Sequence, residues 1–130
     1  FGIKLSSIYA TAKTFDEHKN DKMLFALVAD QSPSNINKSF WVDFLNQPTA
    51  CLHGPEKYSK MFDMPVVYIH IIRKKRGYYD ITFETLTETP AKITEGEITK
   101  QYMLTLEQDI LKDPSQWLWS HRRWKHKPQK

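Results

Sequence analysis

Cysteine is almost missing from this sequence of 130 residues, which limits how the chain can be stabilised. Cys51 is the one cysteine, so the chain can form neither an internal disulfide nor a zinc cluster of several thiolates. A reducing, cytosolic setting is the simplest one for such a chain. The five histidines include no His-Glu-x-x-His pair, so the sequence predicts neither a metal nor another cofactor.

Glycine is scarce too, with residues only at positions 2, 54, 77 and 96. This spacing holds no phosphate-binding loop, no dinucleotide-binding fingerprint and no Gly-x-Ser-x-Gly turn. The sequence therefore argues against nucleotide-binding enzymes and serine hydrolases.

Long hydrophobic runs are absent as well. The longest, residues 23–29 and 64–72, fall far short of the roughly 20 apolar residues that span a bilayer. The composition, 40% hydrophobic and 26% charged, is that of an ordinary globular protein. The length fits one domain over residues 1–130. Because the sequence begins with Phe1 rather than Met, we expect it to be a piece of a longer protein.

Acidic residues are missing from the last ten positions, and this accounts for the net charge of +4. Residues 121–130 contain five Lys or Arg and no Asp or Glu, whereas residues 1–120 contain 14 basic and 15 acidic residues. A body this close to neutral is not typical of a domain that wraps nucleic acid. We therefore treat residues 121–130 as a basic tail and expect electrostatic contacts with anionic partners to be local to it.

The patterns that are present predict strands in three places. Residues 23–29 form a short apolar run that ends in a turn-rich loop, which is typical of a buried strand. Residues 66–72 are apolar on both alternating faces, as in a strand from the middle of a sheet. The alternation over residues 78–88, after the basic residues 73–76 and Gly77, predicts a hairpin with a partly exposed outer strand.

Helices are predicted on either side of these strands. A short helix is expected over residues 55–62. Thr94 and Glu97 form a capping box before apolar residues at every fourth position, which predicts an amphipathic helix over residues 95–112. Asp113 is expected to cap a second short helix that runs through the tryptophans after it. The prediction is thus an α/β fold, a mixed sheet with flanking helices.

Two polar groups are candidate ligand contacts. Asp30 and Gln31 follow the run at 23–29, at the strand end where α/β sheets place their ligand crevices, although a turn-forming aspartate explains the same position. Arg73 is tethered to the strand predicted over 66–72, so it is the member of the basic turn best placed to hold a phosphate. Basic hairpin turns are also commonly just solvated.

Aromatic and basic side chains concentrate at the C-terminal end. Trp117, Trp119 and Trp124 lie within eight residues of one another, and His121 and Arg123 are among them. Tryptophan beside basic residues suits a membrane interface, and it also suits stacking on nucleic-acid bases. A third interpretation is structural, with the tryptophans closing the core. The residues alone leave these three open.

Taken in order, these segments resemble the lipid A biosynthesis acyltransferases of lauroyl or myristoyl type, within the lysophospholipid acyltransferase superfamily. The resemblance covers nearly the whole chain from about residue 24, and the tryptophan-rich end is its most specific part. It rests on ADQSP at 29–33, FWVDFLN at 40–46, Thr49, GPEK at 54–57, PVV at 65–67, Arg73, GYY at 77–79, Asp113-Pro114 and QWLWSHRRWK at 116–125.

The resemblance implies the C-terminal part of a glycerolipid-acyltransferase-like fold, from a membrane-associated enzyme at the cytoplasmic face of the inner membrane. Such an enzyme moves a fatty acyl chain from an acyl carrier protein thioester to a hydroxyl of a lipid A precursor or related lipid. Those two substrates and the membrane surface would be its partners, with no nucleic acid among them.

The resemblance also implies roles for single residues. Four match positions that would orient the acceptor or its phosphate: Asp30, Gln31, Glu56 and Arg73. Five match the terminal signature, whose implied role is structural or lipid-facing: Trp117, Trp119, His121, Arg123 and Trp124.

The family's general base is a histidine in a His-x4-Asp/Glu motif, where the acid orients the histidine. The residues five after His18, His53, His70 and His121 are Met23, Tyr58, Lys75 and His126. No catalytic residue is therefore expected in this chain, and we expect it to be inactive by itself.

Two other functions stay open. One is a binding module for nucleic acid or anionic lipid that uses the Trp- and Arg-rich C-terminus, and the other is a structural or regulatory domain. An upstream coding sequence with an apolar anchor and a His-x4-Asp/Glu motif would decide for the enzyme.

Overall fold

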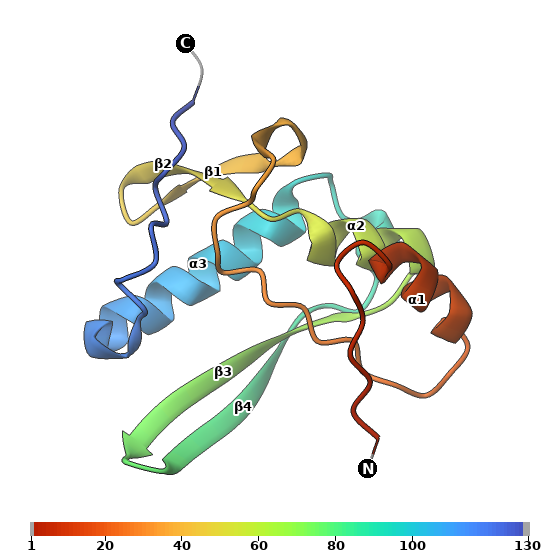
Figure 1. The fold of residues 1–130 in the computed structure, drawn as a ribbon, viewed down its shortest axis with the longest axis horizontal. Coiled ribbons are helices and arrows are strands. Elements are labelled where there is room, and N and C mark those ends of the chain that lie inside the picture. Colours follow the sequence, from red (N-terminus) through yellow and green to blue (C-terminus); the bar gives the residue numbers. More distant parts are fainter. Residues whose placement is uncertain (1, 129–130) are drawn as a thin grey trace.

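The computed structural model describes residues 2–128, with one long helix at the centre (Figure 1). The longer elements, in chain order, are α1 (Thr11–His18), β1 (Phe40–Phe44), β2 (Gln47–Cys51), α2 (Gly54–Phe62), β3 (Val66–Lys75), β4 (Tyr78–Thr87) and α3 (Glu97–Lys112). Three single turns of 3-10 helix accompany them: η1 (Ile36–Lys38), η2 (Pro90–Lys92) and η3 (Pro114–Gln116).

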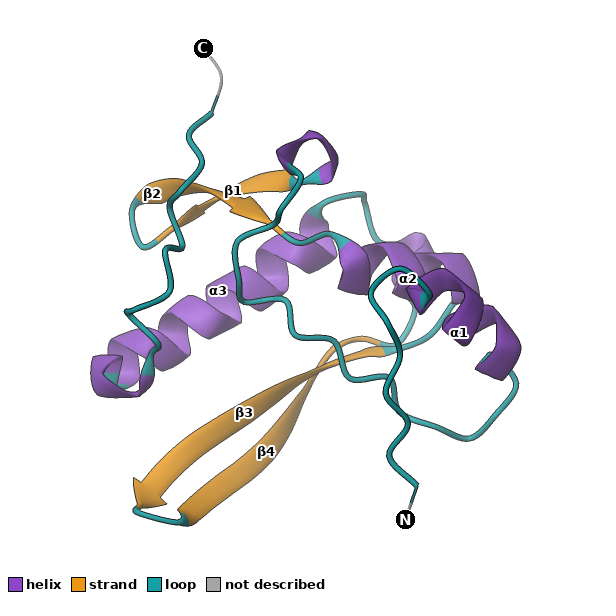
Figure 2. Ribbon diagram, viewed as in Figure 1, coloured by secondary structure: helices purple, strands orange, loops and turns teal. Residues whose placement is uncertain are grey.

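The α/β class is confirmed, but the described strands form two separate antiparallel pairs, β1 with β2 and β3 with β4, rather than the mixed sheet that was predicted. Helix α3 lies between the two pairs (Figure 2). Its buried side chains include Tyr102, Met103 and Ile110. These belong to one apolar cluster with Phe44 of β1 and Leu86 of β4. Burial against α3, rather than strand pairing, therefore joins the two hairpins.

The sequence patterns do not predict the β1–β2 hairpin. Its turn consists of Leu45 and Asn46, which both have positive φ, 49° and 61°. Two successive residues of this kind make the tight turn whose twist matches a hairpin. Asn46 is a common residue there, but leucine is not. The backbone N–H of Leu45 donates to the Glu107 carboxylate of α3 at 2.8 Å, which holds this turn against the helix.

The β3–β4 hairpin is confirmed, but the expectation that β3 lies in the middle of a sheet is not met. Within residues 2–128, β3 pairs with β4 alone. Its outer half is open to solvent, and Ile71 is 61% exposed. The two faces of β3 therefore have different surroundings. One face lies toward α3, whereas the outer half of the other face is exposed.

The strand predicted over residues 23–29 is wrong. The structure assigns no strand to these residues, and Leu24 and Val28 are 71% and 77% exposed. Apolar periodicity signals burial, but a strand also needs a neighbour whose backbone completes its hydrogen bonds. No strand of the described chain pairs with this segment.

The helices predicted over 55–62 and 95–112 are confirmed as α2 and α3. The predicted capping box of α3 is wrong. Gly96, with φ 90°, occupies the N-cap position, so the N-cap residue has no side chain that could make a capping hydrogen bond. The first N–H groups of α3 instead bond to a carboxylate from α2, as described below.

The second helix predicted after α3 is reduced to the single turn η3. Asp113 caps this turn as predicted, because its side chain accepts from the backbone N–H of Ser115 at 3.2 Å. Trp117 then has an extended backbone, so the tryptophan-rich segment runs back across β1 and β2 without helical structure. In the part of the chain that the structure describes, no helix has the length and hydrophobicity needed to cross a membrane.

Candidate functional site

A large apolar groove lies beside the β3–β4 hairpin and α3. Its volume is about 940 Å³, which is at the upper end of pockets that hold small ligands, roughly 300–1,000 Å³. The walls come from residues 24–30, the β3–β4 hairpin, α3 and η3. Apolar side chains dominate them: Leu24, Leu27, Val66, Val67, Ile69, Ile71, Ile72, Phe83, Leu86, Leu106, Ile110 and Trp117. The groove therefore suits a hydrocarbon ligand.

Asp30 lies in the wall of this groove. Its Oδ1 atom is buried and has no hydrogen-bond partner in the described chain. Buried polar atoms are nearly always paired, so an unpaired carboxylate oxygen in a groove wall is an acceptor available to a ligand or a water molecule. Gln31, the next residue, is exposed and does not line the groove.

A network of hydrogen bonds beside the groove was not singled out in the sequence. His70 of β3 lies between two carboxylates, with Nδ1 2.6 Å from Asp109 Oδ2 and Nε2 3.1 Å from Glu84 Oε2. Tyr68, two residues earlier, packs edge-on against His70. Burial, followed by the negative charge and hydrogen bond of Asp109, raises the pKa of Tyr68, so its hydroxyl stays protonated.

This network binds the hairpin to α3. The one sequence signal for it is that His70 interrupts an otherwise apolar strand. No group of three metal-ligating side chains with metal-holding geometry occurs within residues 2–128, so we interpret the His70 network as a structural hydrogen-bond network.

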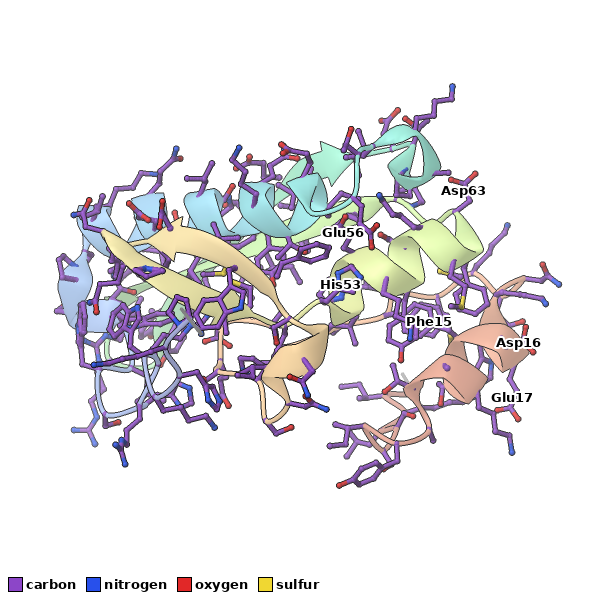
Figure 3. All side chains as sticks on the ribbon, turned by 90° about the horizontal axis from the view of Figure 1, so that it is seen from above. Phe15, Asp16, Glu17, His53, Glu56 and Asp63 are labelled. Atoms are coloured by element: carbon purple, nitrogen blue, oxygen red, sulfur yellow. The ribbon has the colours of Figure 1, made fainter. Side chains whose placement is uncertain are left out.

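Glu56, predicted to orient the acceptor, lies in the interior between α2 and α3 (Figure 3). Its side chain is 0% exposed. One oxygen accepts from Gly96 N at 2.6 Å, and the other accepts from Thr99 N at 2.9 Å and Thr99 Oγ1 at 2.6 Å. Lys60 lies 3.5 Å away. The carboxylate thus caps α3 from another helix.

The electrostatics of Glu56 agree with this role. Burial acts to raise the pKa of its carboxyl group, but the hydrogen bonds from Thr99 and Gly96 and the charge of Lys60 outweigh it, and the pKa is lowered. The ionised carboxylate is therefore the form that the fold holds. Glu56 does not line the groove, and the structure does not bring it together with Asp30.

Arg73 lies near the far end of β3, beside η3. Its backbone N–H donates to Gln116 Oε1 at 2.7 Å, and Gln116 lines the groove. Hydrogen bonds from Ser115 and Gln116, with a smaller contribution from the charge of Arg73, lower the pKa of Asp113. The backbone of Arg73 is thus anchored beside a residue that lines the groove, and its side chain is exposed.

The tryptophan-rich end packs against the domain. Arg123 is 2% exposed, and its Nη1 donates to Ala50 O at 2.7 Å. Trp124 Nε1 donates to Thr49 Oγ1 at 2.9 Å, and Trp117 packs on the core. His121 Nε2 accepts from Ser32 N at 3.0 Å. Four of the five signature residues therefore have structural contacts.

Trp119 bonds within its own segment instead: its Nε1 donates to Pro114 O at 2.7 Å, and 54% of its surface is exposed. The packing of the other four signature residues uses their side chains within the domain, although Leu118 and Trp119 remain 61% and 54% exposed. It favours the structural interpretation of the signature over the other two.

A comparison with protein families is consistent with this arrangement. The family described as bacterial lipid A biosynthesis acyltransferase matches residues 11–126, a span that includes the groove, both hairpins and the tryptophan-rich end. The chain belongs to this family. The searches of curated proteins and of solved structures give no match.

Membership of the lipid A acyltransferase family confirms the resemblance seen in the sequence and indicates acyltransferase chemistry. Within this family member, the ADQSP segment and the signature segment meet in space. Ser32 bonds to His121, and Pro33 O lies 3.0 Å from His126 Nε2. Two segments on which the resemblance rests, with bonded residues 89 or more positions apart in the sequence, thus lie against each other.

Proposed function

We propose that this domain supplies the hydrocarbon-binding groove and an acceptor-orienting carboxylate to an acyltransferase. The reaction transfers a fatty acyl chain from an acyl carrier protein thioester to a hydroxyl of a lipid A precursor, at the cytoplasmic face of the inner membrane. The observation that carries the proposal is the apolar groove with the unpaired oxygen of Asp30 in its wall.

The groove explains why a lipid substrate fits here. Burying an alkyl chain against leucine, isoleucine and valine side chains contributes about 0.8 kcal/mol for each CH₂ group removed from water. The polar side chains in the lining are fewer than the apolar ones and include Asp30, Thr85, Asp109, Lys112, Asp113 and Gln116. A largely apolar wall with a few polar groups is typical of a site that binds a chain and orients its head.

Asp30 supports the orientation of a hydroxyl. An ionised carboxylate only accepts hydrogen bonds, and a hydroxyl of the acceptor is the donor that the proposed reaction provides. Holding that hydroxyl in a fixed direction lowers the entropic cost of acyl transfer. Arg73, whose backbone is anchored beside the groove, is proposed to bind the anionic head of a substrate through its guanidinium.

The general base is proposed to lie outside this chain. The sequence holds no His-x4-Asp/Glu spacing, and both ring nitrogens of His70 are already directed at carboxylates. A base must have a free nitrogen within reach of the acceptor hydroxyl. The chain alone is therefore expected to bind substrate without turning it over.

The experiment compares this chain with a polypeptide that carries both this chain and a His-x4-Asp/Glu motif of the family. Each is incubated with an acyl carrier protein thioester and a lipid A precursor. The proposal expects transfer by the longer polypeptide only. Turnover by the chain alone would place the base within it, and absence of transfer by the longer polypeptide would refute the proposed reaction.

A further inference from the structure

The β3–β4 hairpin extends away from the rest of the domain, with its turn far from both chain ends (Figure 1). Cross-strand partners share a face of such a hairpin, and the register pairs Ile69 with Phe83, Ile71 with Ile81 and Arg73 with Tyr79. We call the face formed by Ile69, Ile71, Tyr79, Ile81 and Phe83 the outer face. The opposite face carries His70, which bonds to α3.

The outer face is strongly apolar and open to solvent. Tyr79, Ile81 and Phe83 are 58%, 56% and 64% exposed. Scattered exposed apolar residues are normal in soluble proteins, but a contiguous patch marks a surface that binds a partner. Ile71 and Phe83 also line the groove, so the outer face adjoins the groove opening.

The tip of the hairpin is basic. Arg73, Lys74, Lys75 and Arg76 follow one another, and residues 71–82 contain one carboxylate, Asp80. Asp80 pairs with Lys74 at 3.1 Å. The ammonium group of Lys75 lies 4.3 Å from the ring centre of Tyr78. The tip thus carries three more basic residues than acidic ones, together with tyrosines. It adjoins the aliphatic side chains of the outer face.

We propose that the hairpin is the element that docks this domain on an anionic lipid bilayer. Cations at the tip are attracted to anionic headgroups, tyrosines favour the headgroup level, and the aliphatic side chains of the outer face gain free energy on entering the acyl region. Aliphatic side chains do not stack on bases, so the composition favours a bilayer over nucleic acid. Docking in this way places the groove opening at the lipid surface.

This inference locates membrane contact away from the basic tail. The segment after η3 and the hairpin turn lie on opposite sides of α3 (Figure 1). Substitutions in the tail and in the hairpin therefore test the two contributions to vesicle binding separately. It is independent of the acyl-transfer proposal, because vesicle binding requires no turnover.

The test measures binding of the whole chain to vesicles of phosphatidylglycerol mixed with phosphatidylcholine, and to vesicles of phosphatidylcholine alone. Lys75→Gln/Arg76→Gln removes two charges from the tip, and Lys125→Gln/Lys127→Gln removes two from the tail as the matched control. Each basic residue near an anionic surface contributes about a factor of five in affinity. We expect the tip variant to lose at least about tenfold in binding to the anionic vesicles, and the tail variant to lose less than about threefold.

A second pair tests the outer face. Tyr79→Thr/Ile81→Thr keeps residues that favour strands, and Met61→Gln/Leu111→Gln removes two exposed apolar side chains from the helices while keeping helix-forming residues. We expect only the first pair to weaken anionic vesicle binding. An equal loss of anionic vesicle binding in the tip and tail variants would overturn the proposal. Unchanged binding in both the tip variant and the outer-face variant would overturn it as well. Tighter binding to RNA than to anionic vesicles, or an outer-face variant that converts a dimer into a monomer, would do the same.

Discussion

The carboxylate of Glu56 accepts a hydrogen bond from the backbone N–H of Thr99 at 2.9 Å and another from the Thr99 hydroxyl at 2.6 Å. These bonds join α2 to the first turn of α3 across 43 positions of sequence. The first bond satisfies one of the N–H groups that every helix leaves open at its start, and the negative charge lies at the positive end of the helix dipole.

Glu56→Ala is expected to lower the free energy of unfolding by about 3 kcal/mol, because it removes charge-assisted hydrogen bonds and leaves buried donors unpaired. Urea denaturation measures this. Lys60→Ala, which removes the cation at 3.5 Å and leaves the capping bonds in place, is the control and should cost less than about 1 kcal/mol. Similar losses in the two variants would contradict the capping role.

The stability contribution of Glu56 should depend on pH. Its pKa in the folded state is below the ordinary value of 4.5, so the unfolded state takes up the proton first as the pH falls. The difference in free energy of unfolding between the native chain and Glu56→Gln therefore has its maximum value above pH 4.5. It shrinks as the pH drops through the folded-state pKa. Urea midpoints measured across this range test the sign, and a difference that grows toward acid pH would refute it.

His70→Leu is expected to loosen the attachment of the β3–β4 hairpin to α3. It removes the hydrogen bond between the ring and Asp109 at 2.6 Å and takes one partner from that partly buried carboxylate, at a cost of about 1–3 kcal/mol. Hydrogen exchange in β3 and β4 should accelerate. Lys74→Ala, which removes the exposed pair with Asp80, should change little. Unchanged exchange in the His70 variant would show that the network does not hold the hairpin.

Arg123→Ala is expected to destabilise the domain by about 3 kcal/mol, because the buried guanidinium donates to Ala50 O and packs over Phe44. The adjacent Arg122 is exposed, so Arg122→Ala should stay within about 0.5 kcal/mol. Thermal unfolding compares them. If the two variants unfolded alike, the signature segment would not be part of the core.

Local patterns predicted α2, α3 and the β3–β4 hairpin, because each depends on periodicity within one segment. Asp30 was predicted at the end of a strand that does not form, and it nevertheless lies in the lining of the groove. The β1–β2 hairpin was missed because its turn uses Leu45 at positive φ, held by Glu107 from 62 positions away.

The partners of single side chains were the least predictable. The capping role of Glu56 and the His70 network depend on residues 39 to 43 positions apart, and no local pattern encodes such pairings. The strand predicted over residues 23–29 failed for the same reason, since a strand requires a partner that the segment does not specify.

The most direct test of the proposed function is the effect of Asp30→Asn on kcat/KM in an acyltransferase polypeptide that contains this chain. Asp63→Asn, at the exposed end of α2, is the matched control. If the unpaired oxygen of Asp30 orients the acceptor hydroxyl, Asp30→Asn should lower kcat/KM at least about tenfold, or about 1.4 kcal/mol of transition-state stabilisation. Asp63→Asn should leave it unchanged. Equal kcat/KM for the Asp30 variant and the native enzyme, with both folded, would contradict the assignment of the groove as the acceptor site.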